Sequence, residues 1–572
     1  MRIRRLEIER FRGIKKLEWN IDGDFVCLVG PGDSTKTTIL DAIEFSLSPR
    51  WNLSFDDSDF YETKTEIPIR IIITIGDLPD EFKSEEKYGY LARGWSANGE
   101  LHDEPNEDDE VVITIELCVD SSLEPTWSVV NERNVDGKVI SAKDREKLGC
   151  TRLGDFLDRH FSWGRGSLLA RFSEDVESPA DILAGAGRAA RAALADLDQE
   201  ALKPLVKTAA KVCRVGAVFG VAPRSCYRPH LDMQAVSVGI GGMCLHDGEV
   251  PLRRAGLGTR RLLAVAMQRE MAKERGLSLI DEAEHGLEPH RIRHFLRVLR
   301  GLDEIKRHVV MTTHAPVVLS ELRAAELRVV RSTDGITTVV PVSATLQPII
   351  LKASDAFLAR KVLVCEGKTE LGLCRRLDTW WADRGNSFGL SGVALVDGGG
   401  SAAPRVAMAF AELGYAVALI ADSDKPIMPD PLALEAAGVR VFQWIDEVAT
   451  EERIALDLPW QGVADVVLLA MEYWNDLSVR DVVANRMCIS SQDLAGHPAE
   501  WACGSQDENK LRRAVGNAAK THNVGNNRKG WFKRVDFAEE LAGIVIKNYD
   551  AIREKDLGAK IDAIRLWAHG NG

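Results

Sequence analysis

Residues 25–37 read FVCLVGPGDSTKT, and this stretch decides the fold of the first half of the chain. The apolar run Phe25–Val29 predicts a buried strand, and the apolar spacing over 39–47 predicts a helix. A glycine-rich turn between them, followed by Lys36 and Thr37, is typical of a P-loop, whose backbone N–H groups wrap phosphates. The nucleotide-binding residues predicted here are Gly30, Gly32, Asp33, Ser34, Thr35, Lys36, Thr37 and Thr38, with Thr37 as a magnesium ligand.

The P-loop departs from the usual pattern at one position, where Thr35 replaces the second glycine. A Cβ atom at this position is expected to strain the loop or slow turnover, because glycine tolerates conformations that other residues avoid.

Further segments complete an ATPase pattern. The apolar run Leu277–Ile280 ends in Asp281, expected to hold Mg²⁺, and Glu282, expected to polarise the attacking water. His314 follows another apolar run and is suitably placed to sense a γ-phosphate. A turn that opens a helix could cap a phosphate with N–H groups; its residues are Gly256, Gly258 and Thr259.

The second half of the chain places acids after apolar strands. Glu366 follows the run at 362–365, and Asp422 and Asp424 follow the run at 416–421. A third apolar run, at 393–396, ends in Asp397. The carboxyl ends of parallel strands meet at one edge of a sheet, and hard oxygen ligands suit Mg²⁺ or Mn²⁺. A divalent-metal site is therefore predicted at this edge.

Composition sets the limits for these interpretations. The 572 residues suffice for about two to four domains, and no run of about 18 apolar residues predicts a membrane span. The ten cysteines form no CxxC pair, which favours reduced thiols in a cytoplasm, and the alternating N-terminus is not expected to be a signal peptide. The net charge of −13 means that binding to nucleic acid would depend on local basic patches.

One such patch near the end of the chain comprises Lys510, Arg512, Arg513, Lys520, Arg528, Lys529, Lys533 and Arg534. It could equally be a solvated helical surface.

The chain is therefore expected to be an α/β protein with five segments. Two ATPase segments at 1–150 and 229–350 flank a helical insert at 151–228 that is rich in alanine and expected to dimerise. A parallel-sheet domain at 355–465 precedes a mostly helical region at 466–572 that completes the acidic site. Within the first segment, strands are also predicted at 66–75 and 111–118.

The first half resembles the ABC-type ATPases of the SMC and RecF kind, a resemblance that includes the start at 8–14 and a D-loop-like segment at 284–289. It implies that Gly256, Gly258 and Thr259 form the signature turn and that His314 is the switch histidine. Since such sites need two heads, it also implies a homodimer. The chain is not a full SMC protein, because no long coiled coil follows.

The second half resembles the TOPRIM domain of topoisomerases, primases and OLD-family nucleases. The resemblance implies metal ligation by Glu366, Asp422 and Asp424, with Glu370 as an additional acid. OLD enzymes also use a later acid and a C-terminal lysine. The implied acid is Glu451, with Glu452 as the alternative, and the implied lysine is Lys529, with Lys533 as the alternative.

An ABC-type ATPase followed by TOPRIM is the OLD architecture, here of class two, and is similar to the nuclease subunit of Gabija anti-phage systems. The expected function is an ATP-binding, Mg²⁺- or Mn²⁺-dependent DNA endonuclease with a two-metal mechanism, in anti-phage defence or DNA repair. The catalytic residues are then Glu366, Asp422, Asp424, Lys529 and, in the ATPase, Glu282. The alternatives are a DNA-repair ATPase with a structural TOPRIM region, or an ATP-gated sensor that activates a partner such as a UvrD-like helicase. A topoisomerase is disfavoured because none of the seven tyrosines has a persuasive context.

Overall fold

The computed structural model describes residues 1–50, 53–134, 136–153, 158–163, 167–169, 185, 189, 206–212, 244–271, 276–301, 308–502, 508–524 and 527–570. They form two compact units. Unit 1 contains Met1 and Glu146–Val309, and unit 2 contains Arg2–Arg145 and Val310–Gly572. Most of the predicted helical insert at 151–228 lies outside the described residues, so its role in dimerisation stays a prediction.

Strand β1 (Arg2–Phe11) lies inside the first sheet of unit 2. It pairs antiparallel with β2 (Ile14–Asn20) and with β4 (Ile69–Gly76). A register shift between Ile3 and Arg5 lets both Ile3 and Leu6 face the core, although they are three residues apart.

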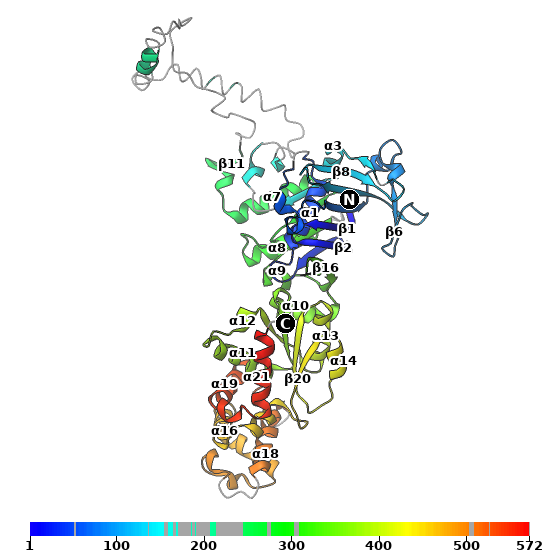
Figure 1. Ribbon diagram of the computed structural model, residues 1–572. Helices are drawn as coiled ribbons and strands as arrows, with labels where there is room; N and C mark the ends of the chain where they lie inside the picture. Colours follow the sequence, from blue (N-terminus) through cyan, green and yellow to red (C-terminus); the bar gives the residue numbers. More distant parts are fainter. Residues whose placement is uncertain are drawn as a thin grey trace. The chain divides into compact units, whose positions relative to one another are not determined.

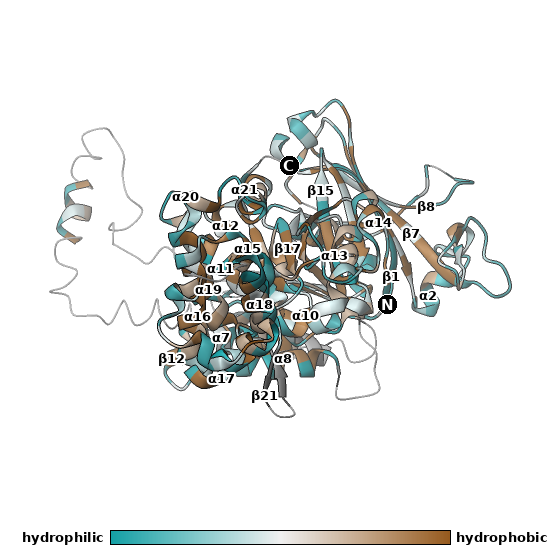
Figure 2. Ribbon diagram, turned by 90° about the horizontal axis from the view of Figure 1, so that it is seen from below, coloured by the Kyte–Doolittle hydropathy of each residue, from teal (hydrophilic) through white to brown (hydrophobic). Residues whose placement is uncertain are grey.

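Within unit 2 this sheet has the strand order β3-β15-β16-β2-β1-β4-β7-β5-β6, and β8 and β9 extend it from β7. The strands predicted at 66–75 and 111–118 correspond to β4 and β7, and β7 is coloured as strongly hydrophobic in Figure 2. The other strands are β3 (Phe25–Val29), β5 (Arg93–Trp95), β6 (Leu101–His102), β7 (Glu110–Val119), β8 (Pro125–Val130), β9 (Lys138–Val139), β15 (Leu327–Thr333) and β16 (Ile336–Pro341).

Helix α1 (Lys36–Leu47) follows β3 after the glycine-rich turn at 30–35, as the P-loop pattern predicts. Its apolar residues Ile39, Leu40, Ile43 and Leu47 are fully buried because they share one face of the helix. The same part of the chain also contains the helices α2 (Asp80–Lys83), α3 (Ala142–Lys147), α9 (Pro316–Ser320) and α10 (Gln347–Lys352).

Unit 1 contains the second set of segments that the sequence predicts to belong to an ATPase. Strand β13 (Leu277–Ile280) is entirely buried and pairs in parallel with β10 (Cys150–Leu153). The other elements here are β11 (His246–Asp247), β12 (Val250–Pro251), α7 (Leu257–Met271) and α8 (Pro289–Leu299), and β14 (His308–Thr312) crosses into unit 2.

The second sheet of unit 2 has four parallel strands in the order β18-β17-β19-β20. Strands β17 (Lys361–Cys365) and β19 (Ala416–Ala421) lie side by side in the middle, so the residues that follow them meet at one edge. The outer strands are β18 (Val393–Asp397) and β20 (Val439–Gln443), and the helices between strands are α11 (Lys368–Ala382), α12 (Phe388–Ser391), α13 (Ala403–Glu412) and α14 (Pro431–Ala436).

The C-terminal region is mostly helical, as predicted, with helices that begin before residue 466; Figure 1 shows it from α18 in orange to α21 in red. Its elements are α15 (Thr450–Asp457), α16 (Trp460–Trp474), α17 (Asp476–Met487), α18 (Glu508–Lys520), the hairpin of β21 (His522–Val524) and β22 (Asn527–Lys529), α19 (Val535–Lys547), α20 (Tyr549–Ile552) and α21 (Asp556–His569).

One hydrophobic core joins these helices to the four-stranded sheet. It contains Leu363 of β17, Ile420 of β19, Leu541 of α19 and the fully buried Trp531. This shared core fixes the C-terminal segments against the strand ends. Among the described residues, none of the helices combines the length and the apolar character needed to cross a membrane.

Candidate active site

A cluster of carboxylates lies at the carboxyl ends of β17 and β19. Cys365 pairs with Ile420 in register, so Glu366 and Asp422 leave the sheet close to each other. The Oε2 atom of Glu366 accepts a hydrogen bond of 2.8 Å from the backbone N–H of Asp422. The structure thus brings together two of the acids that the sequence placed on strand ends.

Two further acids in this cluster are deeply buried. Glu370, in the first turn of α11, and Glu451, in the first turn of α15, are each 2% exposed. Glu370 Oε2 accepts from the N–H of Gly367 at 2.8 Å, and Glu451 Oε1 accepts from the hydroxyl of Thr369 at 2.8 Å. The remaining oxygens, Glu370 Oε1 and Glu451 Oε2, are buried and accept no hydrogen bond. Since buried carboxylate oxygens normally have partners, these two suit a cationic ligand.

Thr450 holds Asp422 in place. Its N–H and its hydroxyl both donate to Asp422 Oδ1, at 2.8 and 2.9 Å. Trp444 Nε1 donates to the same hydroxyl at 2.8 Å, which fixes its orientation. Sequence reasoning gave no role to Thr450 or Thr369, because the contacts that define them come from segments distant in the chain.

Two lysines contact the acids. Lys533 Nζ lies 2.7 Å from Glu451 Oε1, and Lys520 Nζ lies 2.7 Å from Asp424 Oδ2 and 3.2 Å from Glu452 Oε2. Lys529, the lysine preferred from sequence, ends β22, and its side chain lies outside the described part of the chain.

The environments of Glu451 and Glu452 differ. Glu452 Oε2 accepts from the N–H of Ala449 at 2.9 Å, which caps α15, and also binds Lys520. Glu451 is more deeply buried and keeps an oxygen without a donor. Glu451 is therefore better suited than Glu452 to bind a ligand.

The acids perturb one another. Burial, followed by the charges of Glu370 and Glu451, raises the pKa of Asp422 to about 7. Burial and then the neighbouring Asp422 raise the pKa of Glu366, and burial and then Glu451 raise that of Glu370. Burial opposes the charged form of Lys533, but Glu451 and Glu370 outweigh it and raise its pKa. Close acids with raised pKa values favour binding of a cation.

Among the described residues, no three His, Cys, Asp or Glu side chains converge closely enough to hold a metal ion as they stand. Lysines, hydroxyls and backbone N–H groups hold the carboxylates instead. Binding of an ion therefore requires some of these side chains to turn toward it.

The P-loop of unit 2 is closed around its own lysine. Lys36 Nζ donates to the carbonyl of Gly30 at 3.1 Å, that of Pro31 at 2.8 Å and the hydroxyl of Ser34 at 2.9 Å. Thr35 precedes α1 with φ of 62°, in the left-handed region. A β-branched residue rarely adopts this conformation, so the strain expected from the missing glycine is located at Thr35.

In unit 1, arginines hold the segment after β13. Arg152 pairs with Asp281 Oδ2 at 2.8 Å, and the buried Arg261 donates to the carbonyl oxygens of Asp281 and Glu282. At the start of α7, a Cβ on Gly258 would lie 2.4 Å from the carbonyl oxygen of Gly286. Only glycine permits this approach, so the predicted signature turn and the predicted D-loop are in contact within unit 1. His314, in unit 2, is exposed after β14.

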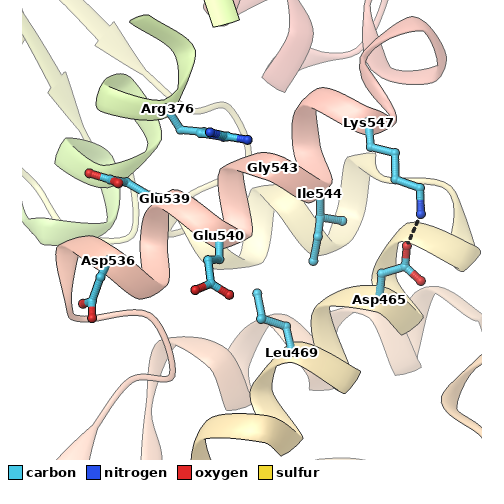
Figure 3. A pocket seen from close by; sticks show the side chains of 9 residues that line it. All are labelled: Arg376, Asp465, Leu469, Asp536, Glu539, Glu540, Gly543, Ile544 and Lys547. Atoms are coloured by element: carbon cyan, nitrogen blue, oxygen red, sulfur yellow. Dashed lines mark hydrogen bonds and ion pairs between the residues drawn. The ribbon is translucent and has the colours of Figure 1, made fainter. Parts of the chain in front are cut away.

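A separate cavity of about 540 Å³ lies among α11, α16 and α19 (Figure 3). Its charged lining consists of Arg376, Asp465, Asp536, Glu539, Glu540 and Lys547. None of the clustered acids lines it, and four acids against two bases do not suit a polyanion.

Comparison with family models identifies the domains. Residues 1–162 match the AAA ATPase domain, residues 245–320 match an AAA domain described as putative AbiEii toxin of a type IV TA system, and residues 357–424 match the TOPRIM domain of overcoming lysogenization defect (OLD) protein-like families. The chain thus combines AAA-type ATPase segments with an OLD-like TOPRIM domain. These matches confirm an ATPase in the first half of the chain and an OLD-like TOPRIM domain in the second half. The assignment to class two and the likeness to the Gabija nuclease subunit stay predictions.

The chain is 23% identical over 355 residues to the OLD nuclease of Thermus scotoductus. The match covers 58% of this chain and 62% of that relative. Solved structures of SMC heads are similar at 14% identity: one from Thermotoga maritima, and one with an extended coiled coil, bound to the C-terminal domain of ScpA, derived from Pyrococcus furiosus. The Thermotoga structure covers 60% of this chain and 100% of its own length, with a TM-score of 0.28. The Pyrococcus structure covers 61% of this chain and 98% of its own length, with a TM-score of 0.35. Both scores are too low to support a conclusion about this chain.

Proposed function

We propose that this chain is an ATP-binding, Mg²⁺- or Mn²⁺-dependent DNA endonuclease. The observation that carries the proposal is the pair of buried oxygens, Glu370 Oε1 and Glu451 Oε2, that accept no hydrogen bond beside Asp422. The OLD-like TOPRIM domain and the relative named a nuclease support it.

The donor set fits a hard divalent cation, because all the candidate ligands are carboxylate oxygens. We infer that Glu366, Glu370, Asp422, Asp424 and Glu451 would hold two such ions. Bound there, the ions would activate water and stabilise the leaving oxygen of a phosphodiester.

The chain's own residues prepare the site. Thr450 fixes the position of Asp422, and Thr369 fixes Glu451. We infer that Lys533, rather than Lys529, supplies positive charge to the phosphate in the transition state. Its ammonium contacts a site carboxylate, and 41% of its side chain remains exposed for a substrate to reach.

The P-loop residues, Asp281 and Glu282 would bind and hydrolyse ATP, with the signature turn and His314 acting across a homodimer of ATPase heads. DNA is the proposed substrate. A role in anti-phage defence or repair and a helicase partner of UvrD type rest on the resemblance alone.

The test is cleavage of supercoiled plasmid with Mg²⁺ or Mn²⁺, with and without ATP, by wild type and Asp422→Asn. Loss of cutting in the variant is expected. Asp430→Asn is the matched control, since Asp430 only caps α14 through the N–H of Ala433, at 2.8 Å, and asparagine caps equally well. Equal cutting by Asp422→Asn and wild type would reject the site, and the repair ATPase or the sensor would replace the nuclease.

A further inference from the structure

Lys520 occupies a defined position beside the acids because two other residues on its face of α18 fix this helix against α15. Arg512, Gly516 and Lys520 are spaced four residues apart and so share that face. The buried guanidinium of Arg512 donates to the carbonyls of Ala455 at 2.9 Å and Leu458 at 2.6 Å, at the end of α15.

The middle residue of this face sets the distance between the helices. A Cβ on Gly516 would lie 2.7 Å from the Cα of Glu452, so only glycine allows α18 to approach this closely. The approach brings Lys520, at the end of α18, to the carboxylates of Asp424 and Glu452.

Lys520 links two parts of the site. Asp424 follows strand β19, whereas Glu452 belongs to α15, and the ammonium lies 2.7 and 3.2 Å from their oxygens. The acid side chains are only 14% and 12% exposed, so this pair is less screened by water than a surface ion pair.

This contact conflicts with a second cation at the same oxygen. A divalent ion bound to Asp424 Oδ2 would lie within a few ångströms of the Lys520 ammonium, and the two would repel each other strongly in a partly buried site. We propose that Lys520 is a positioning residue that competes with a divalent cation for the carboxylate of Asp424. It thereby sets the affinity of this side of the site for metal; the inference rests on the proposed metal-dependent function.

The experiment is a calorimetric titration of the full chain with Mn²⁺, without DNA or nucleotide. Binding at this site is defined as the part that Asp422→Asn loses. Lys520→Met should bind Mn²⁺ about tenfold more tightly than wild type, because it removes the competing charge but keeps the length of the side chain. Lys520→Arg, which keeps the charge, should retain the wild-type affinity.

Lys547→Met is the matched control, since Lys547 pairs with Asp465 at 3.1 Å rather than with a site carboxylate, and it should leave affinity unchanged. If Lys520→Met loses its melting transition, Lys520→Gln gives the same measurement. Unchanged or weaker Mn²⁺ binding without the lysine charge overturns this inference alone. Absence of Mn²⁺ binding by wild type overturns it together with the proposed function.

Discussion

Lys533 Nζ lies 2.7 Å from Oε1 of Glu451, so a cation and an almost fully buried acid from segments about 80 residues apart meet at the strand ends. Thr369 donates to the same oxygen, and Glu451 Oε2 remains for another ligand. The lysine therefore occupies only one oxygen of Glu451. The other oxygen can still bind a ligand, and the ammonium can still contact a substrate.

Lys533→Met should lower the single-turnover cleavage rate at saturating DNA by roughly 10²-fold, with DNA affinity nearly unchanged. The reason is that its charge is proposed to act on the transition state. Lys529→Met serves as the comparison and should lose only modest affinity. A wild-type rate for Lys533→Met with an inactive Lys529→Met would return the role to Lys529.

Asp422 should make stability depend on pH. Its pKa is about 7 in the fold but about 3.9 in an unfolded chain, so ionisation favours unfolding. The contribution of the neutral carboxyl to the stability of the metal-free protein is lost as pH rises from about 4 to about 7. Asp422→Asn should therefore stabilise the fold at pH 8, on the order of 2–4 kcal/mol, and little at pH 4.

Thermal melts with chelator at both pH values test this, with Asp430→Asn as the control. An equal shift at pH 4 and pH 8 would show that the pKa of Asp422 is not raised in the fold.

Thr35→Gly should raise ATP turnover. It removes a β-branched residue from φ of 62°, a conformation that costs L-residues roughly 1–2 kcal/mol. Thr35→Ala keeps the backbone constraint and should show much less effect. Steady-state hydrolysis and binding of a fluorescent ATP analogue distinguish the outcomes; turnover no higher than wild type would mean that the loop is not limiting.

Substitutions in two of the ATPase motifs should affect nucleotide binding and ATP hydrolysis separately. Lys36→Ala should weaken nucleotide binding, because it removes the charge that meets the phosphates. Glu282→Gln should bind ATP normally but hydrolyse it at least tenfold more slowly, since it loses the base near the water. Equilibrium binding and hydrolysis assays check both; normal hydrolysis by Glu282→Gln would exclude it as the catalytic acid–base residue.

The expectation that Arg512 contacts a phosphate of DNA is corrected by the structure. The place of Arg512 in a basic stretch suggested an ordinary phosphate contact, but the residue is only 8% exposed and its guanidinium donates to two carbonyls at the end of α15. Arg512→Ala should destabilise the chain by about 2–3 kcal/mol. Arg513 is exposed, and Arg513→Ala should instead flatten the salt dependence of DNA binding by about one unit of slope. Melting curves and DNA titrations across salt compare the two variants; equal stability would contradict the structural role of Arg512.

Local pattern was enough to predict the strand–acid junctions at Glu366 and Asp422, because an apolar run that ends in an acid is visible over a few residues. The roles of Thr450, Lys520 and Lys533 could not be predicted this way. Their contacts depend on how α15, α18 and the segment after β22 pack against the sheet, and that packing comes from a core spread over many separate segments. For the same reason, the sequence alone could not distinguish buried Arg512 from exposed Arg513.

Thr450 directs both of its donors to a single oxygen of Asp422, Oδ1, and so occupies both of that atom's lone pairs. While Thr450 keeps these bonds, Oδ2 is the oxygen left for a ligand, and Asp422 coordinates through one oxygen. Ca²⁺ often takes a carboxylate through both oxygens and loses that mode at Asp422, whereas the octahedral geometry of Mg²⁺ needs only one oxygen from each carboxylate. The threonine would thus make the site selective among divalent cations without touching any of them.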